Sequence, residues 1–409
     1  MKILHVNKFF DLRGGTEAYL HQLMDRQRAA GHDVHALSTR SPENLPSADA
    51  ERFVERFDLS KSDGPVRDAQ KALAFVWNRE AKRAMEAAIR DLKPDVVHLH
   101  NIYHHLSTSI LAPIRDARIP CVQTLHDYKL ACPNYKMFTE GAPCERCKGG
   151  RYFEAVKHHC LFPSTAGNVL AAMEMGMTKA FQSYERTIRT FICPTQFVAD
   201  KMSSWGEPSS KFTILPNPVA EAAQMADRDG GYILAAGRVS QEKGLDVLIR
   251  AAAAVPEVQI RIAGIGPEES RLKNLASTMD VTNVQFVGFL RGIDLWEARR
   301  GAMALAVPSV WYENAPLAVL EAMAEGLPII ASRIGGLPEL VQHEGNGLLV
   351  EAGNVAAWSE TLRRFLSLPR EETDRFASIS RERARTLFTW QKHLDGLDGI
   401  YKEVITSNR

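Results

Sequence analysis

Two successive series of short apolar segments, each followed by a longer amphipathic segment, constrain the fold of this chain most strongly. Alternation of this kind is typical of βαβ units and predicts parallel sheets. The first series predicts strands at Ile3–Val6, Val34–Ser38, Val96–His100, Val122–Leu125, Thr190–Cys193 and Thr213–Leu215. The second predicts strands at Ile233–Ala236, Gln259–Ala263, Val284–Val287, Leu305–Val307, Ile329–Ala331 and Leu348–Val350. Because 409 residues exceed the usual size of a single core, we expect two α/β domains.

A looser segment with Pro and Gly at its ends separates the two series. It runs from Pro216 to Gly231 and has no strong apolar period, so we interpret it as the interdomain linker. The predicted domains are residues 1–217, with a cysteine-containing insert at 130–165, and residues 218–389. A last helix is predicted from about Trp390 to Thr406.

The charge balance and the start of the chain exclude several classes of protein. Fifty basic and 49 acidic residues give a formal charge of +1, which provides no overall basic field for nucleic acid. The first residues lack the pattern of a signal peptide, and no apolar run reaches the length of a spanning helix. We therefore expect a cytoplasmic protein that contacts a membrane peripherally at most.

The segment from Trp311 to Ser332 carries the most specific pattern. Asn314 is predicted to cap a helix just after a strand, where free backbone amides form an anion site suited to a diphosphate. Glu313 precedes this helix and Glu321 lies about two turns inside it, so the two carboxylates would hold different parts of one ligand. The alternative is that both are solvated surface acids. The residues expected at the anion site are Asn314, Ala315, Pro316 and Leu317.

A second loop places two cations and two glycines after the first strand of the second domain. It extends from Gly237 to Gly244 and contains Arg238 and Lys243. A guanidinium fork and a point charge together neutralise a diphosphate leaving group without a metal. Read alone, such a basic pair is more often a solvated surface feature.

The first half supplies a glycine pair and a histidine cluster at predicted strand ends. Gly14 and Gly15 permit close approach of the backbone to a phosphate or a sugar, although an ordinary βα turn explains them equally well. His126 follows the strand at Val122–Leu125, at the edge where ligands collect in parallel sheets. A lone histidine there is usually a polar residue whose hydrogen bonds are satisfied.

Four cysteines of the insert raise a separate question, because their spacing contains one CxxC pair. Four thiolates of this kind fit a structural zinc site, with disulfides or free thiols as the alternatives. The other two cysteines, Cys121 and Cys193, fall in predicted strands and are expected in the core. The candidate metal ligands are Cys132, Cys144, Cys147 and Cys160.

Together these motifs resemble glycosyltransferase family 4 over nearly the whole chain, because its Glu-x7-Glu motif matches Glu313 and Glu321. The resemblance implies that Glu313 faces the hydroxyls of the donor sugar and that Glu321 binds the nucleotide ribose. It assigns Arg238 and Lys243 to the donor diphosphate, and His126 to the histidine that contacts the transferring sugar. The further donor-binding positions are Gly14, Gly15, Gly237, Gly264, Gly266, Val287 and Phe289. Gly264-x-Gly266 alone is a weak NAD fingerprint.

The resemblance implies an α/β GT-B fold, with two Rossmann-like domains around a cleft and a C-terminal helix, 390–409, that crosses back to the first domain. It implies a retaining transferase that moves a sugar from UDP or GDP to a glycan or lipid-linked acceptor, in bacterial cell-surface polysaccharide synthesis. No metal is expected in the chemistry. The alternatives are a nucleotide-sugar epimerase of similar architecture and a non-catalytic subunit that binds sugar nucleotides.

Overall fold

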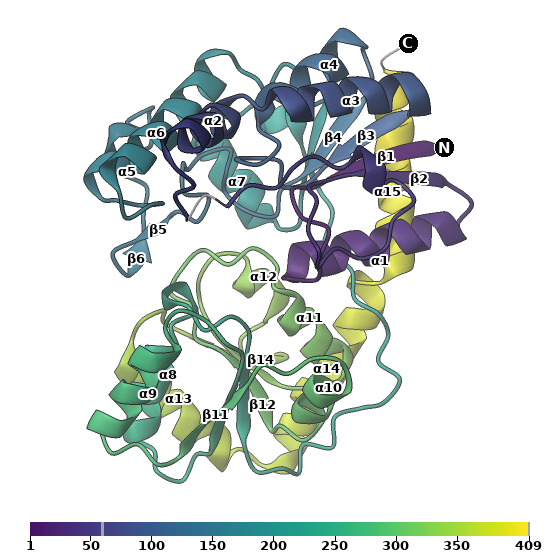
Figure 1. Ribbon diagram of the computed structural model, residues 1–409. Coiled ribbons are helices and arrows are strands. Elements are labelled where there is room, and N and C mark those ends of the chain that lie inside the picture. Colours follow the sequence, from purple (N-terminus) through teal and green to yellow (C-terminus); the bar gives the residue numbers. More distant parts are fainter. Residues whose placement is uncertain (59–60, 408–409) are drawn as a thin grey trace.

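The computed structural model describes residues 1–58 and 61–407. It contains two α/β lobes, each built on a six-stranded parallel sheet (Figure 1). The strands of the N-terminal lobe are β1 (Lys2–Val6), β2 (Asp33–Leu37), β3 (Val96–Leu99), β4 (Cys121–Thr124), β7 (Thr190–Cys193) and β8 (Phe212–Ile214). Those of the C-terminal lobe are β9 (Ile233–Ala236), β10 (Ile260–Ala263), β11 (Val284–Gly288), β12 (Ala304–Val307), β13 (Ile329–Ser332) and β14 (Gly347–Val350). All twelve predicted strands are present, with boundaries shifted by one residue at most.

The order of the strands determines where a ligand site forms in each lobe. The sheets run β2-β1-β3-β4-β7-β8 and β11-β10-β9-β12-β13-β14. The connections reverse direction between β1 and β3 in one lobe, and between β9 and β12 in the other. In open parallel sheets, ligands bind beyond the carboxyl ends of the strands at such a switch point. The loops after these four strands therefore mark the candidate site.

Helices cover both faces of each sheet. In the N-terminal lobe they are α1 (Gly15–Ala29), α2 (Pro65–Val76), α3 (Arg79–Leu92), α4 (Leu111–Asp116), α5 (Phe153–Lys157), α6 (Thr165–Ala180) and α7 (Gln196–Ser204). In the C-terminal lobe they are α8 (Leu245–Ala253), α9 (Glu269–Thr278), α10 (Gly292–Arg300), α11 (Leu317–Ala324), α12 (Leu337–Leu340), α13 (Val355–Ser367) and α14 (Arg370–Leu387). No helix in the described part of the chain combines the length and apolar character required to cross a bilayer.

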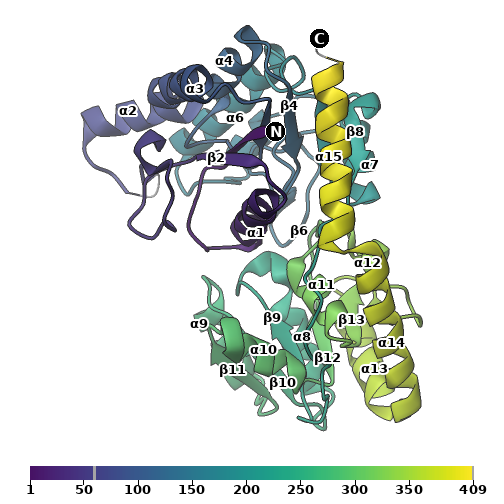
Figure 2. The same ribbon diagram turned by 90° about the vertical axis from the view of Figure 1, so that its right-hand side faces the viewer.

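The last helix, α15 (Trp390–Thr406), leaves the C-terminal lobe and lies along the N-terminal lobe (Figure 2). Its Leu397, Ile400 and Val404 pack against Ile3 and Val122 of the first sheet. The predicted crossing of the C-terminal helix is therefore confirmed, apart from residues 408 and 409, which lie outside the described residues. We propose residues 1–217 with 390–409, and residues 218–389, as the two domains.

The apolar series along α6 faces outward. Met173 and Met177 of this helix and Phe181 at its C-terminal end are exposed. The opposite face of α6 is buried instead, and it includes Glu174. The Glu174 carboxylate pairs with the ammonium of Lys129 at 2.6 Å. This buried ion pair fixes α6 to the insert that follows β4, whose short strands are β5 (Phe138–Thr139) and β6 (Ala142–Pro143).

Candidate functional site

The loops after β4 and β12 bring the two lobes into contact. The Asn314 side chain donates a hydrogen bond at 2.8 Å to the carbonyl of Leu125, the residue that precedes His126. Asn314 was expected to cap a helix, but α11 begins at Leu317 without a side-chain cap. Asn314 does not cap α11 because its side-chain amide is hydrogen-bonded instead to Leu125 and to Thr195 of the N-terminal lobe.

An ion pair forms the centre of the site in the C-terminal lobe. The Lys243 ammonium lies 2.7 Å from the Glu313 carboxylate, which also accepts a hydrogen bond of 2.6 Å from Ser309. Glu313 is only 3% exposed, whereas the Lys243 side chain is 28% exposed. A carboxylate this deeply buried requires a charged or hydrogen-bonding partner. The lysine therefore holds Glu313 while its own face remains open to a ligand.

Four close backbone contacts explain why glycines recur in the loops of this lobe. A Cβ on Gly244 would lie 2.1 Å from the carbonyl oxygen of Pro308, and Gly244 has a positive φ of 63°. A Cβ on Gly335 would lie 2.3 Å from the carbonyl oxygen of Glu313. Similarly, Gly264 and Gly266 face the backbone of the loop that begins at Gly237. Both glycines are predicted to bind the donor. In the structure they let their own loop pack closely against the loop that begins at Gly237.

The second glutamate lies apart from the first. Glu321 pairs with the Arg299 guanidinium at 2.8 Å, and Arg299 also forms an ion pair with Glu325. Burial raises the pKa of Glu321, and the charge of Arg299 opposes that rise. Glu321, Arg299 and Leu317 line a pocket of about 380 Å³ together with Tyr19 of the N-terminal lobe. Sequence analysis did not identify Arg299, because nothing in the spacing links α10 to α11.

Of the remaining predicted donor residues, Gly15 lies beside the start of α11. Gly15 approaches Leu317, since a Cβ on the glycine would lie 3.5 Å from the leucine side chain. The N-termini of α1 and α11 therefore approach each other across the lobes. Arg238 is exposed and forms no hydrogen bond or ion pair with Lys243, Glu313 or Glu321 in the described part of the chain, and Phe289 is 62% exposed.

His126 lies at the end of β4, half-buried beside the Tyr19 ring. Its Nε2 is 3.0 Å from Nδ1 of His100, and burial lowers the pKa of His126 to about 3. The ring is therefore neutral near pH 7, which leaves it a donor on one nitrogen and an acceptor on the other. A cationic role does not fit such an environment.

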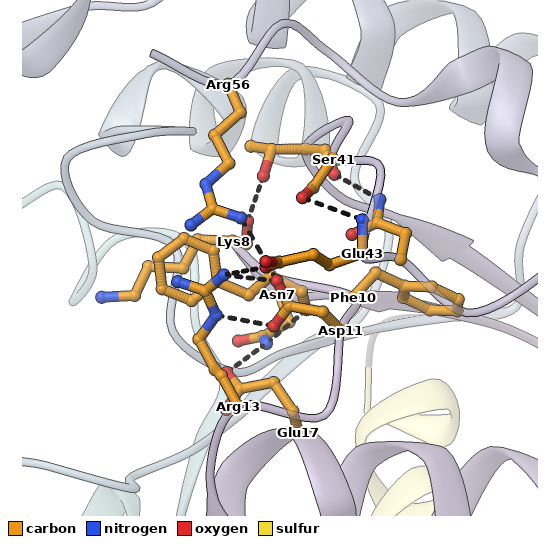
Figure 3. Close-up of polar contacts among 12 residues, drawn as sticks. Asn7, Lys8, Phe10, Asp11, Arg13, Glu17, Ser41, Glu43 and Arg56 are labelled. Atoms are coloured by element: carbon orange, nitrogen blue, oxygen red, sulfur yellow. Dashed lines mark hydrogen bonds and ion pairs between the residues drawn. The ribbon is translucent and has the colours of Figure 1, made fainter. Parts of the chain in front are cut away.

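Sequence analysis missed a polar cluster on the N-terminal lobe, which surrounds Asp11 (Figure 3). Arg13 donates to the Asp11 carboxylate at 2.6 Å, and Arg56 donates to it at 3.2 Å. Burial disfavours the charged carboxylate, but the hydrogen bond and charge of Arg13 lower the pKa of Asp11 overall. Nearby, burial lowers the pKa of Lys8 to about 7, with its ammonium 3.5 Å from the centre of the Tyr103 ring. These side chains come from loops without a recognisable motif.

The four insert cysteines are free thiols in one region, and their charges affect one another's pKa. Burial raises the pKa of Cys132 to about 11, although backbone N–H groups of Met137 and Asn134 that donate to its sulfur oppose that rise. The sulfur atoms of the four insert cysteines are nevertheless not as close to one another as the ligands of a closed zinc site. Among the described residues, the one group of three potential metal ligands whose atoms all lie within 4.8 Å of each other is His5, His98 and His100. Zinc binding by the cysteines therefore stays a prediction, and Cys121 and Cys193 are buried as expected.

Comparison with known proteins adds independent findings. A model described as Glycosyltransferase Family 4 matches residues 13–222, and one described as Glycosyl transferases group 1 matches residues 220–383. A D-inositol 3-phosphate glycosyltransferase of Saccharomonospora viridis is 35% identical over 46% of this chain and 47% of the relative. The chain thus spans about half the length of that relative.

Solved structures resemble the whole chain. Sucrose-phosphate synthase from Thermosynechococcus elongatus has a TM-score of 0.73 at 18% identity, and the match covers 100% of both chains. Anabaena HepE in complex with UDP-glucose has a TM-score of 0.68 at 17% identity, covering 98% of this chain and 100% of the other. At these identities the likeness establishes the two-lobed fold alone.

Proposed function

Because this chain belongs to glycosyltransferase family 4 and has the GT-B fold, we propose that it transfers a sugar, with retention, from a UDP- or GDP-linked donor to a glycan or lipid-linked acceptor. The observation that carries this proposal is the hydrogen bond from Asn314 to Leu125. It joins the segment that bears Glu313 to the segment that bears His126. Donor-side and acceptor-side groups therefore meet at one boundary between the lobes.

We assign each donor group the role that the family resemblance implies. Lys243 and Arg238 neutralise the leaving diphosphate beside the N-terminus of α11, and Glu313 holds the hydroxyls of the donor sugar. Glu321 accepts the ribose hydroxyls in the pocket beside Leu317. Both glutamates are paired with cations, which speaks against a glycosidase-like nucleophile. The departing phosphate is then the base that takes the proton of the acceptor hydroxyl.

We assign the acceptor to the N-terminal lobe. Arg13 and Arg56 both pair with the Asp11 carboxylate, Arg13 also lies 3.6 Å from Glu43, and we propose that these guanidinium groups bind an anionic group of the acceptor. A phosphorylated acceptor agrees with the name of the curated relatives, D-inositol 3-phosphate glycosyltransferase. A lipid-linked acceptor would place the protein at the cytoplasmic face of a membrane, and the exposed Met173 and Phe181 of α6 support that location.

Incubation with UDP- and GDP-sugars, with and without phosphorylated or lipid-linked acceptors, tests this function. We expect one donor to raise the melting temperature by mass action. We also expect nucleotide release that requires an acceptor and a product with the anomeric configuration of the donor. Glu321→Ala should abolish both effects. An epimerised sugar formed from donor alone would establish the epimerase instead, and donor binding without nucleotide release would establish the non-catalytic subunit.

A further inference from the structure

A series of buried hydrogen bonds in two parts runs through the interior of the N-terminal lobe. The first part joins the carbonyl of Pro216 in the linker to His393 and Tyr19. The second part runs from Thr124 to His126. The buried members come from β1, β3 and its C-terminal end, β4, α1 and α15, and each is at most 3% exposed. They are His393 and Tyr19 in the first part, and Thr124, His98, Tyr401, Gln27, His5 and His100 in the second.

Every histidine in this series is neutral near pH 7. Burial lowers the pKa of His393 and of His5 to about 4, and it lowers the pKa of His98 and His100 well below the usual value. A neutral imidazole has one N–H and one lone pair. Fixing the proton on one ring therefore fixes the direction of each hydrogen bond that follows.

The carbonyl of Pro216 determines which atoms donate and which accept in the first part of the series. A carbonyl only accepts, so His393 donates from Nδ1 to Pro216 at 2.8 Å. The free Nε2 of His393 must then accept from the Tyr19 hydroxyl, also at 2.8 Å.

The Gln27 amide sets the direction of the second part, because its NH2 group only donates and its carbonyl only accepts. Tyr401 accepts from the Gln27 amide at 3.3 Å and donates to Nδ1 of His98 at 2.6 Å, so Nε2–H of His98 donates to Thr124 at 2.8 Å. The Gln27 carbonyl accepts from Nε2–H of His5 at 2.7 Å. Nδ1 of His5 then accepts from Nε2–H of His100 at 3.1 Å. Nδ1 of His100 is left to accept from Nε2–H of His126 at 3.0 Å.

We infer that this network fixes His126 as the Nε2–H tautomer and presents its Nδ1 lone pair to the cleft, where it accepts a hydrogen bond from a substrate hydroxyl. No described residue occupies that Nδ1. A lone pair attracts a sugar hydroxyl and repels a phosphate oxygen, so His126 selects the sugar side of the substrate. Gln27, His5 and His100 are positioning residues. The inference rests on the proposed function only in naming the ligand as a sugar.

The network also explains the three histidines that lie close enough to suggest a metal site. Each ring nitrogen of His5, His98 and His100 already has a hydrogen-bond partner within the protein. No lone pair is left for a metal ion without breaking the series. The cluster therefore transmits proton positions rather than binding a cation.

Nitrogen NMR of the ¹⁵N-histidine-labelled protein tests the tautomer without any substrate. The His126 signals, assigned by their loss in His126→Asn, should show Nε2 protonated and Nδ1 unprotonated at pH 7. Gln27→Met removes the acceptor of His5 and should give mixed tautomers at His126. Gln27→Glu keeps an acceptor and should restore the single form, and the exposed Gln391→Met should change nothing. A protonated Nδ1 in the unsubstituted protein, or an unchanged tautomer in Gln27→Met, overturns the inference.

Substitutions at His126 provide a second readout through transfer. An Asn amide reaches the position of Nδ1 and keeps an acceptor there, whereas a Gln amide reaches Nε2 and does not. We expect His126→Asn to retain at least about tenfold more transfer than His126→Gln, the equivalent of one hydrogen bond. The reverse order contradicts the inference. Absence of transfer in every protein, with the tautomer as expected, would overturn the proposed function alone.

Discussion

At the scale of single residues, Lys243 has two electrostatic roles. Its ammonium pairs with Glu313 at 2.7 Å, and it keeps a partly exposed face toward the cleft. The first role stabilises the fold, because Glu313 is buried and needs a partner. The second stabilises a leaving diphosphate. Substituting the lysine alone disturbs both, so a single variant does not separate them.

Lys243→Ala should reduce kcat by about 10²–10³, the usual cost of losing one group that stabilises developing charge. It should also lower the melting temperature, because the Glu313 carboxylate loses its ion pair. The double variant Lys243→Ala/Glu313→Gln should recover the melting temperature but not transfer, since the neutral amide needs no cation. The exposed Lys402→Ala serves as control. Normal turnover in Lys243→Ala would remove its role at the diphosphate.

At the scale of elements, glycines determine how closely the loops of the C-terminal lobe approach. Gly244, Gly264 and Gly335 each face a backbone atom at a distance that excludes a side chain. These contacts position the loop of Lys243 against the strand end that leads to Glu313. The geometry of the donor site therefore depends on backbone packing as much as on charge.

Gly244→Ala should lower the free energy of unfolding by about 1–3 kcal/mol and weaken donor binding, because φ is positive and Pro308 occupies the Cβ position. Gly399→Ala, within α15, is a control that should change the stability in the opposite direction. No atom lies within 4 Å of its added Cβ, so alanine should stabilise the helix by about 0.5–1 kcal/mol. Chemical denaturation of both variants measures these effects. Equal stabilities would contradict the packing explanation.

The cysteine insert gives a second prediction at this scale. If the four thiols bind Zn²⁺, the purified protein should contain one zinc per chain, and metal binding should draw the sulfurs together. Cys144→Ser should lower the zinc content, whereas Cys193→Ala, in the core of β7, should not. Elemental analysis with thiol titration decides this. A protein without zinc and with four reactive insert thiols would show that the insert is ordered by its own packing.

At the scale of the whole molecule, buried histidines connect stability to pH. Eight histidines of the N-terminal lobe and α15 have a lowered pKa in the folded protein: His5, His21, His98, His100, His104, His105, His126 and His393. The unfolded chain therefore takes up protons first as the pH falls below about 6.5. Their contribution to stability is complete above that pH and is lost as the pH falls toward 4.

Thermal unfolding between pH 7 and pH 4 should show this loss. The free energy of unfolding should fall by about 1.4 kcal/mol per pH unit for each fully buried histidine in that window. His98→Asn should reduce the slope by one such increment, while the exposed His159→Asn should leave it unchanged. A melting temperature independent of pH across this range would contradict the burial of neutral rings.

The amino-acid sequence by itself determined the strands, the last helix and the α/β class, because periodicity and turn residues act locally. It also identified Glu313 and Lys243, whose ion pair was not foreseen. Only the tertiary structure decided which side chains meet: Asn314 binds Leu125 instead of capping α11, and Arg299 pairs with Glu321. The histidine network joins residues up to 374 positions apart. Sequence spacing carries no record of such contacts, since they arise when separate elements pack together.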